Sequence, residues 1–226
     1  MVRSVNEAAL PSRVAMMGGT FDPVHLGHLR SAVELHEALG LDCLHMVPAA
    51  RSPLRDTPQV TPEDRLALLR LGIGDTPGLV ADPRELSRSG PSYSVDTLAE
   101  LRELYGAEAC LVMVLGHDAF LRLPEWRDPQ RLFRLANLVV IDRPDHETPW
   151  SEALRELMAG REVEDRADLL AVPQGRALHL RLPSRMALSA TEVRRRLAAG
   201  ESVRYLLPEA VESYLLTHGL YRPASA

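Results

Sequence analysis

Short apolar runs alternate along this chain with longer amphipathic runs, and this alternation constrains the fold more than any other feature. The strongest run, 109–115, is apolar throughout, and a second such run spans 137–141. Runs without a polar face are typical of parallel strands that are covered on both sides of a sheet. Further strands are expected at 13–17, where Gly18-Gly19 forms the following turn, and at 43–47, 79–81 and 178–182.

Amphipathic runs between these strands predict helices. Residues 26–39 carry apolar residues on one side, and Gly40 is the expected stop. Thr61 as N-cap, Pro62 in the first turn and acids behind it predict the start of another helix. Helices are also expected at 94–105, 151–158, 190–199 and 208–218. The alternation predicts an α/β fold with a doubly wound, mostly parallel, Rossmann-like sheet and C-terminal helices.

Size and patterning favour one domain over residues 1–226. The chain has 226 residues, of which 46% are hydrophobic and 25% charged, so it is long enough for one substantial core. We expect that core to span about 13–221. Residues 145–180 are expected to be a variable excursion, mainly loop over 151–175, because this region is charged and weakly periodic.

Charge and cysteine usage exclude several classes of protein. The formal net charge of −5 provides no global basic field for nucleic acid. Cys43 and Cys110 lie in apolar runs without metal-site spacing, so we expect buried free thiols in a reducing compartment. Residues 1–13 are mixed polar without a long apolar core, so we expect no signal peptide, and no run reaches the roughly 18 apolar residues of a membrane span. A cytoplasmic protein without a membrane partner is expected, and homo-oligomer formation stays open.

The segment 18–28 is the most informative motif, because it follows a strand and opens a helix. Gly18 and Gly19 allow close backbone approach to a ligand, and the helix start favours anions. His25 and His28 are three apart, so both should project to one side and donate to phosphate oxygens. Partial protonation would add positive charge. A zinc site or two unrelated surface histidines are the alternatives, but no further metal ligand is suggested and no metal site is predicted.

These residues also carry a family resemblance. The run 20–28, Thr-Phe-Asp-Pro-Val-His-Leu-Gly-His, resembles the (T/S)xxH and HxGH motifs of a nucleotidyltransferase superfamily. Segments 92–98, 115–126, 188–194 and 205–221 are similar, in order, to bacterial nicotinate mononucleotide adenylyltransferases. The resemblance implies transfer of the adenylyl group of ATP to nicotinate mononucleotide, which gives nicotinate adenine dinucleotide and pyrophosphate.

The resemblance and the motif together predict two sets of binding residues. The ATP set is Gly18, Gly19, Thr20, Phe21, His25, His28, Gly116, Asp118, Ser189, Thr191 and Arg194, in which His25, His28 and Arg194 are the predicted catalytic residues. The mononucleotide set is Asp22, Arg51, Arg55, Tyr93, Ser94, Trp126 and Arg127.

One loop departs from the family pattern. Leu54 stands where the family commonly has histidine, while Arg55 keeps a cation for the mononucleotide phosphate and Arg51 compensates. We add Arg127 as a cation for the ring carboxylate, beside Trp126 as the stacking partner of the pyridine ring.

Several alternatives remain open. Residues 194–196 could form a solvated face or a nucleic-acid stripe, Asp118 could be a helix N-cap, and Trp126 could be a core residue. The acceptor could be nicotinamide mononucleotide or phosphopantetheine, or the protein could bind nucleotide without turnover. For the main hypothesis, a phosphate dianion attacks in line without a covalent enzyme intermediate, and Mg²⁺ arrives with ATP.

Overall fold

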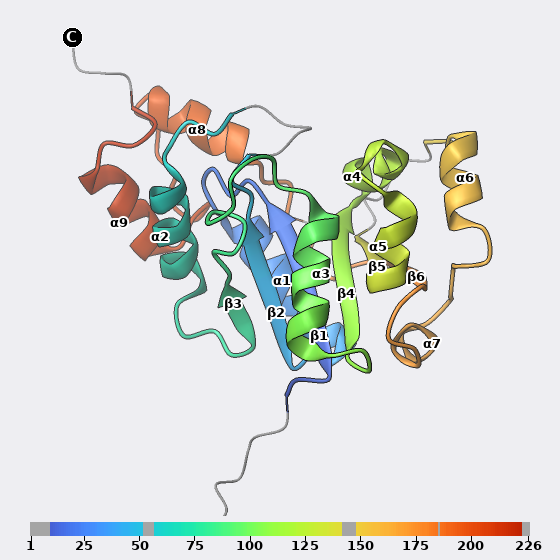
Figure 1. Cartoon of the computed structure of the whole chain (residues 1–226). Helices are drawn as coiled ribbons and strands as arrows, with labels where there is room; N and C mark the ends of the chain where they lie inside the picture. Colours follow the sequence, from blue (N-terminus) through green and yellow to red (C-terminus); the bar gives the residue numbers. More distant parts are fainter. Residues whose placement is uncertain (1–9, 52–56, 142–147, 185, 223–226) are drawn as a thin grey trace, which may run out of the picture.

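Six parallel strands form one sheet in the computed structural model, which describes residues 10–51, 57–141, 148–184 and 186–222 (Figure 1). The strands are β1 (Arg13–Gly19), β2 (Cys43–Pro48), β3 (Leu79–Ala81), β4 (Cys110–Gly116), β5 (Asn137–Ile141) and β6 (Ala177–Leu180). Their order is β3-β2-β1-β4-β5-β6, and every neighbouring pair is parallel. The chain therefore runs outward in both directions from β1 and β4. Ligands of such sheets bind outside the carboxyl ends of the two strands at this switch point.

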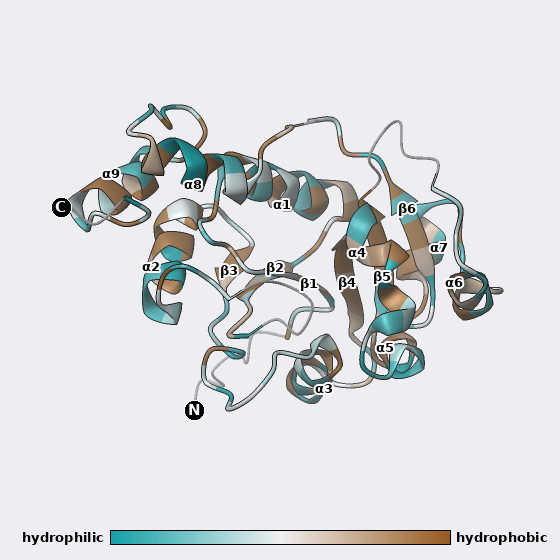
Figure 2. Ribbon diagram, turned by 90° about the horizontal axis from the view of Figure 1, so that it is seen from above, coloured by the Kyte–Doolittle hydropathy of each residue, from teal (hydrophilic) through white to brown (hydrophobic). Residues whose placement is uncertain are grey.

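Helices cover both faces of the sheet, as the apolar strands predicted (Figure 2). One face packs against α1 (Leu26–Leu39), α2 (Pro62–Ile73), α7 (Arg166–Leu170), α8 (Ala190–Ala198) and α9 (Glu209–Thr217). The other packs against α3 (Ser94–Tyr105), α4 (His117–Leu121), the 3-10 turn η1 (Leu123–Glu125), α5 (Pro129–Leu135) and α6 (Glu152–Met158). Strand β1 alternates between these two cores, with Ala15 in one and Met16 in the other.

Local sequence signals place most element ends within two residues of the expected positions. Gly40 ends α1 in the left-handed region, with φ 58°. The Thr61 side chain caps α2 by accepting from the Asp64 amide at 3.1 Å. The α/β class, the parallel sheet and the C-terminal helices are confirmed.

The segment expected to be mainly loop contains more structure than predicted. Asp165 caps α7 by accepting from the Asp168 amide at 2.9 Å, and Leu169 of this five-residue helix is fully buried. Glu162 also bridges to Ala177 of β6. A helix this short shows little periodicity in sequence, so tertiary burial of Leu169 determines it.

Two smaller observations concern composition. Both cysteines are free, and Cys110 is buried as expected, whereas Cys43 is only partly buried. Across the described ranges, no helix combines the length and apolar character that crossing a membrane requires.

Candidate active site

The turn from β1 into α1 brings the two predicted histidines together at the switch point. His25 is the N-cap of α1, and its carbonyl accepts from the amides of His28 at 3.0 Å and Leu29 at 3.2 Å. The imidazole rings of His25 and His28 stack, with centroids 3.7 Å apart and planes 24° apart. The Phe21 ring meets the His28 ring edge-on at 5.1 Å. The two histidines therefore share one side of the turn, as their spacing predicted.

Two glycines make this packing sterically feasible. A Cβ on Gly27 would lie 3.0 Å from His25 Nδ1 and 3.4 Å from the Leu188 Cβ. A Cβ on Gly19 would lie 3.0 Å from the Phe21 ring. At Gly18, by contrast, a Cβ would meet only the Met16 terminal methyl at 3.6 Å, an ordinary contact. A Cβ at position 19 or 27 would therefore displace a neighbouring ring by a few tenths of an ångström, while a ligand-facing role of Gly18 stays a prediction.

The expected protonation of both histidines is wrong for His25. Burial lowers the pKa of His25 to about 4, since only 4% of the residue is exposed. His25 is therefore neutral at pH 7 and offers a hydrogen bond rather than a charge. His28 is more exposed, lying at an intermediate level of burial.

The start of α8 lies beside this turn. Ser189 caps the helix by accepting from the Glu192 amide at 3.2 Å. Arg194 donates from Nη1 to the Asp22 carbonyl at 2.7 Å and from Nη2 to Thr191 Oγ1 at 3.3 Å. The predicted triphosphate segment and the histidine turn, more than 160 residues apart in sequence, thus adjoin in space.

The three consecutive arginines have different surroundings. Arg195 pairs with Glu192 at 2.8 Å and with Glu201 at 2.9 Å, and Arg196 pairs with Glu192 at 2.8 Å. Only Arg194 reaches the turn. Arg195 and Arg196 therefore lie in exposed ion pairs, as the alternative of a solvated face describes.

Asp22, a predicted mononucleotide ligand, makes several hydrogen bonds within the protein. Its Oδ1 accepts from the Tyr221 hydroxyl at 2.5 Å, and its Oδ2 accepts from the Gln59 amide at 3.0 Å. Arg194 Nη1 lies 3.8 Å from the same Oδ2. Because Asp22 is only 5% exposed, the geometry favours a fold role that sequence reasoning missed.

Arg65 of α2 is a second residue that the sequence did not single out. It is fully buried, and its Nη1 donates to the carbonyls of Thr20 at 2.8 Å and Ala49 at 2.7 Å. Burial lowers the pKa of this guanidinium, which nevertheless remains a cation. Arg65 therefore ties the residues that follow β1 and β2 to each other. The segment 62–73 contains two arginines, Arg65 and Arg70, and nothing in the sequence separates the buried Arg65 from the exposed Arg70.

Besides Asp22, the predicted mononucleotide residues come from three segments. Ser92 Oγ accepts from the Ala50 amide at 2.9 Å, and the Ser92 amide donates to the Arg51 carbonyl at 2.9 Å. These bonds hold the loop after β2 against the start of α3, where Tyr93 is the N-cap and Ser94 the first helical residue. Arg55 and Leu54 lie outside the described residues.

Arg127 approaches the same helix start from the segment after η1. Its guanidinium carbon lies 4.6 Å from the centroid of the Tyr93 ring, a cation–π contact. Trp126 is half-buried and packs against the core on the α3 face of the sheet. The alternative of a core tryptophan therefore describes its buried part, and the rest of the side chain is exposed.

Gly116 and Asp118, two predicted ATP ligands, lie at the end of β4 and the start of α4. Gly116 is the N-cap of α4, and Asp118 lies exposed in the first turn. The N-cap alternative for Asp118 is therefore wrong, because Gly116 occupies that position.

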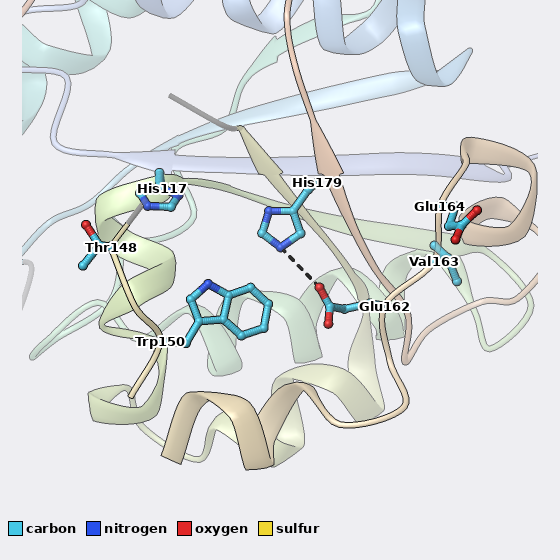
Figure 3. Close-up of a pocket in the computed structure, with 7 residues that line it drawn as sticks. All are labelled: His117, Thr148, Trp150, Glu162, Val163, Glu164 and His179. Atoms are coloured by element: carbon cyan, nitrogen blue, oxygen red, sulfur yellow. Dashed lines mark ion pairs between the residues drawn. The ribbon is translucent and has the colours of Figure 1, made fainter. Parts of the chain in front are cut away.

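A cavity of about 730 Å³ lies next to α4, outside the predicted residue sets (Figure 3). It is lined by His117, Thr148, Trp150, Glu162, Val163, Glu164 and His179. The rings of Trp150 and His179 are nearly parallel, with centroids 5.7 Å apart, and His179 Nε2 lies 3.8 Å from Glu162 Oε1. Sequence reasoning missed this cavity, because its lining comes from separate, weakly patterned segments.

The donors around the turn suit phosphate oxygens: imidazole nitrogens, a guanidinium and helix-start amides. Within the ranges that the structure describes, no three His, Cys, Asp or Glu residues are grouped to hold a metal ion.

Comparisons with known proteins agree with this geometry. The family model described as cytidylyltransferase-like matches residues 16–196. A protein of Chromohalobacter salexigens named "Probable nicotinate-nucleotide adenylyltransferase" is 66% identical over 213 residues, covering 94% of this chain and 97% of the relative. A relative of the same name from Pseudomonas fluorescens is 45% identical, with coverage of 93% and 97%.

A solved structure supports the fold. The nicotinic acid mononucleotide adenylyltransferase of Plasmodium falciparum, determined in complexes with APC and with NaAD, superposes with a TM-score of 0.69 at 14% identity. The superposition covers 93% of this chain and 97% of that one. With the histidine turn at the switch point and relatives of high identity over nearly the whole length, the chain belongs to the nicotinate-nucleotide adenylyltransferase family, within the cytidylyltransferase-like proteins.

Proposed function

We propose that this enzyme transfers the adenylyl group of ATP to nicotinate mononucleotide, giving nicotinate adenine dinucleotide and pyrophosphate. The observation that carries the proposal is the stacked pair of His25 and His28, with ring centroids 3.7 Å apart, beside Arg194 at the switch point of the sheet. The family membership and the names of the relatives support the same activity.

On the ATP side, the start of α1 holds the triphosphate. Amides at a helix N-terminus and the helix dipole stabilise anions. His28 approaches the α-phosphate more closely than His25, and Arg194 binds the β- and γ-phosphates together with Ser189 and Thr191. Asp118 accepts from ribose hydroxyls, and Gly18, Gly19, Thr20, Phe21 and Gly116 form the surrounding backbone. Arg194 already reaches the turn through the Asp22 carbonyl, which supports this role.

On the mononucleotide side, Trp126 stacks on the pyridine ring. The ring carboxylate meets the backbone near Ser94 and the guanidinium of Arg127, which the contact with Tyr93 holds over the start of α3. Arg51 and Arg55 bind the phosphate of the mononucleotide. Asp22 acts indirectly, because its carboxylate is bonded within the protein.

The chemistry needs positioning rather than a general base. The acceptor phosphate is mostly a dianion at neutral pH, so its oxygen attacks the α-phosphorus directly. A new phosphorus–oxygen bond forms as the bond to the pyrophosphate oxygen breaks, and pyrophosphate leaves with the electron pair. The protein lowers the barrier by holding the two anions in line and by placing donors around the developing charge. Mg²⁺ bound to the triphosphate would neutralise part of that charge.

A side-by-side assay of pyrophosphate release tests this function. With ATP, nicotinate mononucleotide should give the highest kcat/KM, above nicotinamide mononucleotide and phosphopantetheine. A preference for either alternative acceptor would replace the proposed substrate. Binding of ATP without turnover of any acceptor would favour a nucleotide-binding regulator. Cytoplasmic location, a single nucleotidyltransferase domain and the absence of a nucleic-acid partner stay predictions from the sequence.

A further inference from the structure

The C-terminal segment contacts the histidine turn through one hydrogen bond. The Tyr221 hydroxyl donates to Asp22 Oδ1 at 2.5 Å, across 199 residues of sequence. Leu220 and Tyr221 pack against the core on the α1 face of the sheet. Burial and the bond to Asp22 raise the pKa of the Tyr221 hydroxyl far above its usual range, so this group stays a donor. The contact therefore persists over the working pH range of an enzyme.

Asp22 connects this hydroxyl to two other parts of the site. Its Oδ2 accepts from the Gln59 amide at 3.0 Å, in the segment that leads from the β2 loop to α2. Its backbone carbonyl accepts from Arg194 Nη1 at 2.7 Å. Asp22 thus contacts the C-terminal segment at Tyr221 and the segment before α2 at Gln59. It also contacts Arg194, the predicted triphosphate ligand.

The charges of Asp22 and Arg194 explain why the Tyr221 hydroxyl would affect turnover. A buried carboxylate next to a polyphosphate is unfavourable unless donors satisfy it. Without the Tyr221 hydroxyl, Asp22 Oδ1 would lose its donor, and Arg194 Nη1 is already only 3.8 Å from Oδ2. The guanidinium would then shift toward the carboxylate and away from the β- and γ-phosphates.

We propose that Tyr221 is a positioning residue for adenylyl transfer, which acts through Asp22 to keep Arg194 directed at the triphosphate. This inference rests on the proposed function. It also assigns Asp22 to the support of the triphosphate site, since its carboxylate faces Tyr221 and Gln59.

A matched tyrosine in the same C-terminal segment provides the control. The Tyr214 hydroxyl of α9 donates to Asp64 Oδ1 of α2 at 3.0 Å, whereas the Tyr221 hydroxyl donates to Asp22 of the turn. Tyr221→Phe and Tyr214→Phe therefore each remove one tyrosine–aspartate bond. We expect Tyr221→Phe to lower kcat/KM for ATP about tenfold, the effect of one charge-assisted hydrogen bond. Tyr214→Phe should keep wild-type kinetic constants. Tyr221→Phe should lower the Tm more than Tyr214→Phe, because Asp22 is buried whereas Asp64 is only partly buried, so the kinetics are measured well below both Tm values.

A double-variant cycle tests the route through Asp22. In an Asp22→Ala background, Tyr221→Phe should cause no further loss of kcat/KM, because its acceptor is already absent. If the losses of kcat/KM caused by Asp22→Ala and by Tyr221→Phe multiplied in the double variant, the positioning role would be overturned. Equal losses of kcat/KM in Tyr221→Phe and Tyr214→Phe would overturn it as well.

Binding of α,β-methylene-ATP, measured by calorimetry on the same proteins, separates this proposal from the proposed function. Tyr221→Phe should raise Kd about tenfold, and Tyr214→Phe should leave it unchanged. If the wild-type protein failed to turn over nicotinate mononucleotide, the proposed function would fall. The Kd values would still decide the role of Tyr221, and an unchanged Kd in Tyr221→Phe would reject it.

Discussion

The ring of His28 contacts two other rings, stacked on His25 at 3.7 Å and edge-on to Phe21 at 5.1 Å. This packing restricts the His28 side chain before any ligand arrives. A restricted donor loses little conformational entropy when the transition state forms. The relationship between His28 and His25 underlies the first two predictions.

Replacing His28 by alanine should lower kcat by about 10²- to 10³-fold, as for the loss of one oriented donor to a developing charge. The Tm should change little, since His28 is only partly buried. Steady-state kinetics and thermal unfolding measure the two effects. His218→Ala is the matched control, because His218 stacks on Tyr214 in α9 and should keep full turnover. Near-normal turnover of His28→Ala would remove this residue from catalysis.

Gly27→Ala should impair activity more than stability. The added Cβ would lie 3.0 Å from His25 Nδ1 and 3.4 Å from the Leu188 Cβ, so the ring and the segment before α8 must shift. Alanine is favoured over glycine in a helix by about 1 kcal/mol, which offsets part of the strain. We expect kcat/KM to fall at least tenfold while urea unfolding changes little. An active variant with a lowered urea midpoint would contradict this account.

A buried ion pair away from the site predicts how stability changes with pH. His45 Nδ1 lies 2.7 Å from Asp82 Oδ2, and its Nε2 lies 2.8 Å from the Tyr105 hydroxyl. Burial lowers the pKa of His45, but the hydrogen bonds and charge interactions with Asp82 and Cys43 together outweigh burial and raise it to about 9. The folded state therefore binds the proton more tightly than the unfolded state, so this stabilisation is complete below pH 6.5 and is lost as pH rises through about 9.

Urea unfolding at pH 7 and pH 9.5 checks this expectation. The free energy of unfolding should fall by an amount on the order of 2 kcal/mol from this group. His45→Gln should show a smaller fall, whereas His218→Ala should keep the wild-type fall. If the free energy of unfolding of His45→Gln fell with pH as much as that of the wild type, the His45–Asp82 pair would not contribute to the pH dependence of stability.

Arg127→Ala should weaken discrimination between the two mononucleotides. The guanidinium stacks on Tyr93 at 4.6 Å, so its charge lies over the start of α3, where the ring carboxylate is proposed to bind. KM for nicotinate mononucleotide should rise about tenfold, and KM for the uncharged nicotinamide analogue should change little. Arg122→Ala is the control, because Arg122 pairs with Glu125 at 2.8 Å. Parallel changes for both substrates would exclude a carboxylate contact.

Arg55→Ala should raise KM for nicotinate mononucleotide much more than KM for ATP. Arg55 is the cation that remains where Leu54 replaces the usual histidine of the family. Initial-rate measurements with each substrate varied in turn measure both constants. Equal effects on the two substrates would remove Arg55 from the phosphate of the mononucleotide.

The sequence by itself predicted the six strands, most of the helices and the turn that carries His25 and His28. Thr61 caps the start of α2 and Gly40 ends α1, and both effects depend only on residues close by in the sequence. Strands that are apolar throughout, such as β4, predict a sheet covered on both faces. The spacing of three residues between His25 and His28 predicted that both side chains project to the same side of the turn. This prediction is also local, because helix geometry fixes the relative direction of side chains that are close in sequence.

Only the tertiary structure decided which distant groups complete the site. No local pattern pairs Asp22 with Tyr221, buries Arg65 beneath Thr20 and Ala49, or makes His25 neutral. Hydrogen-bond partners and burial depend on how segments far apart in the chain pack together, and packing also sets the pKa of a buried group.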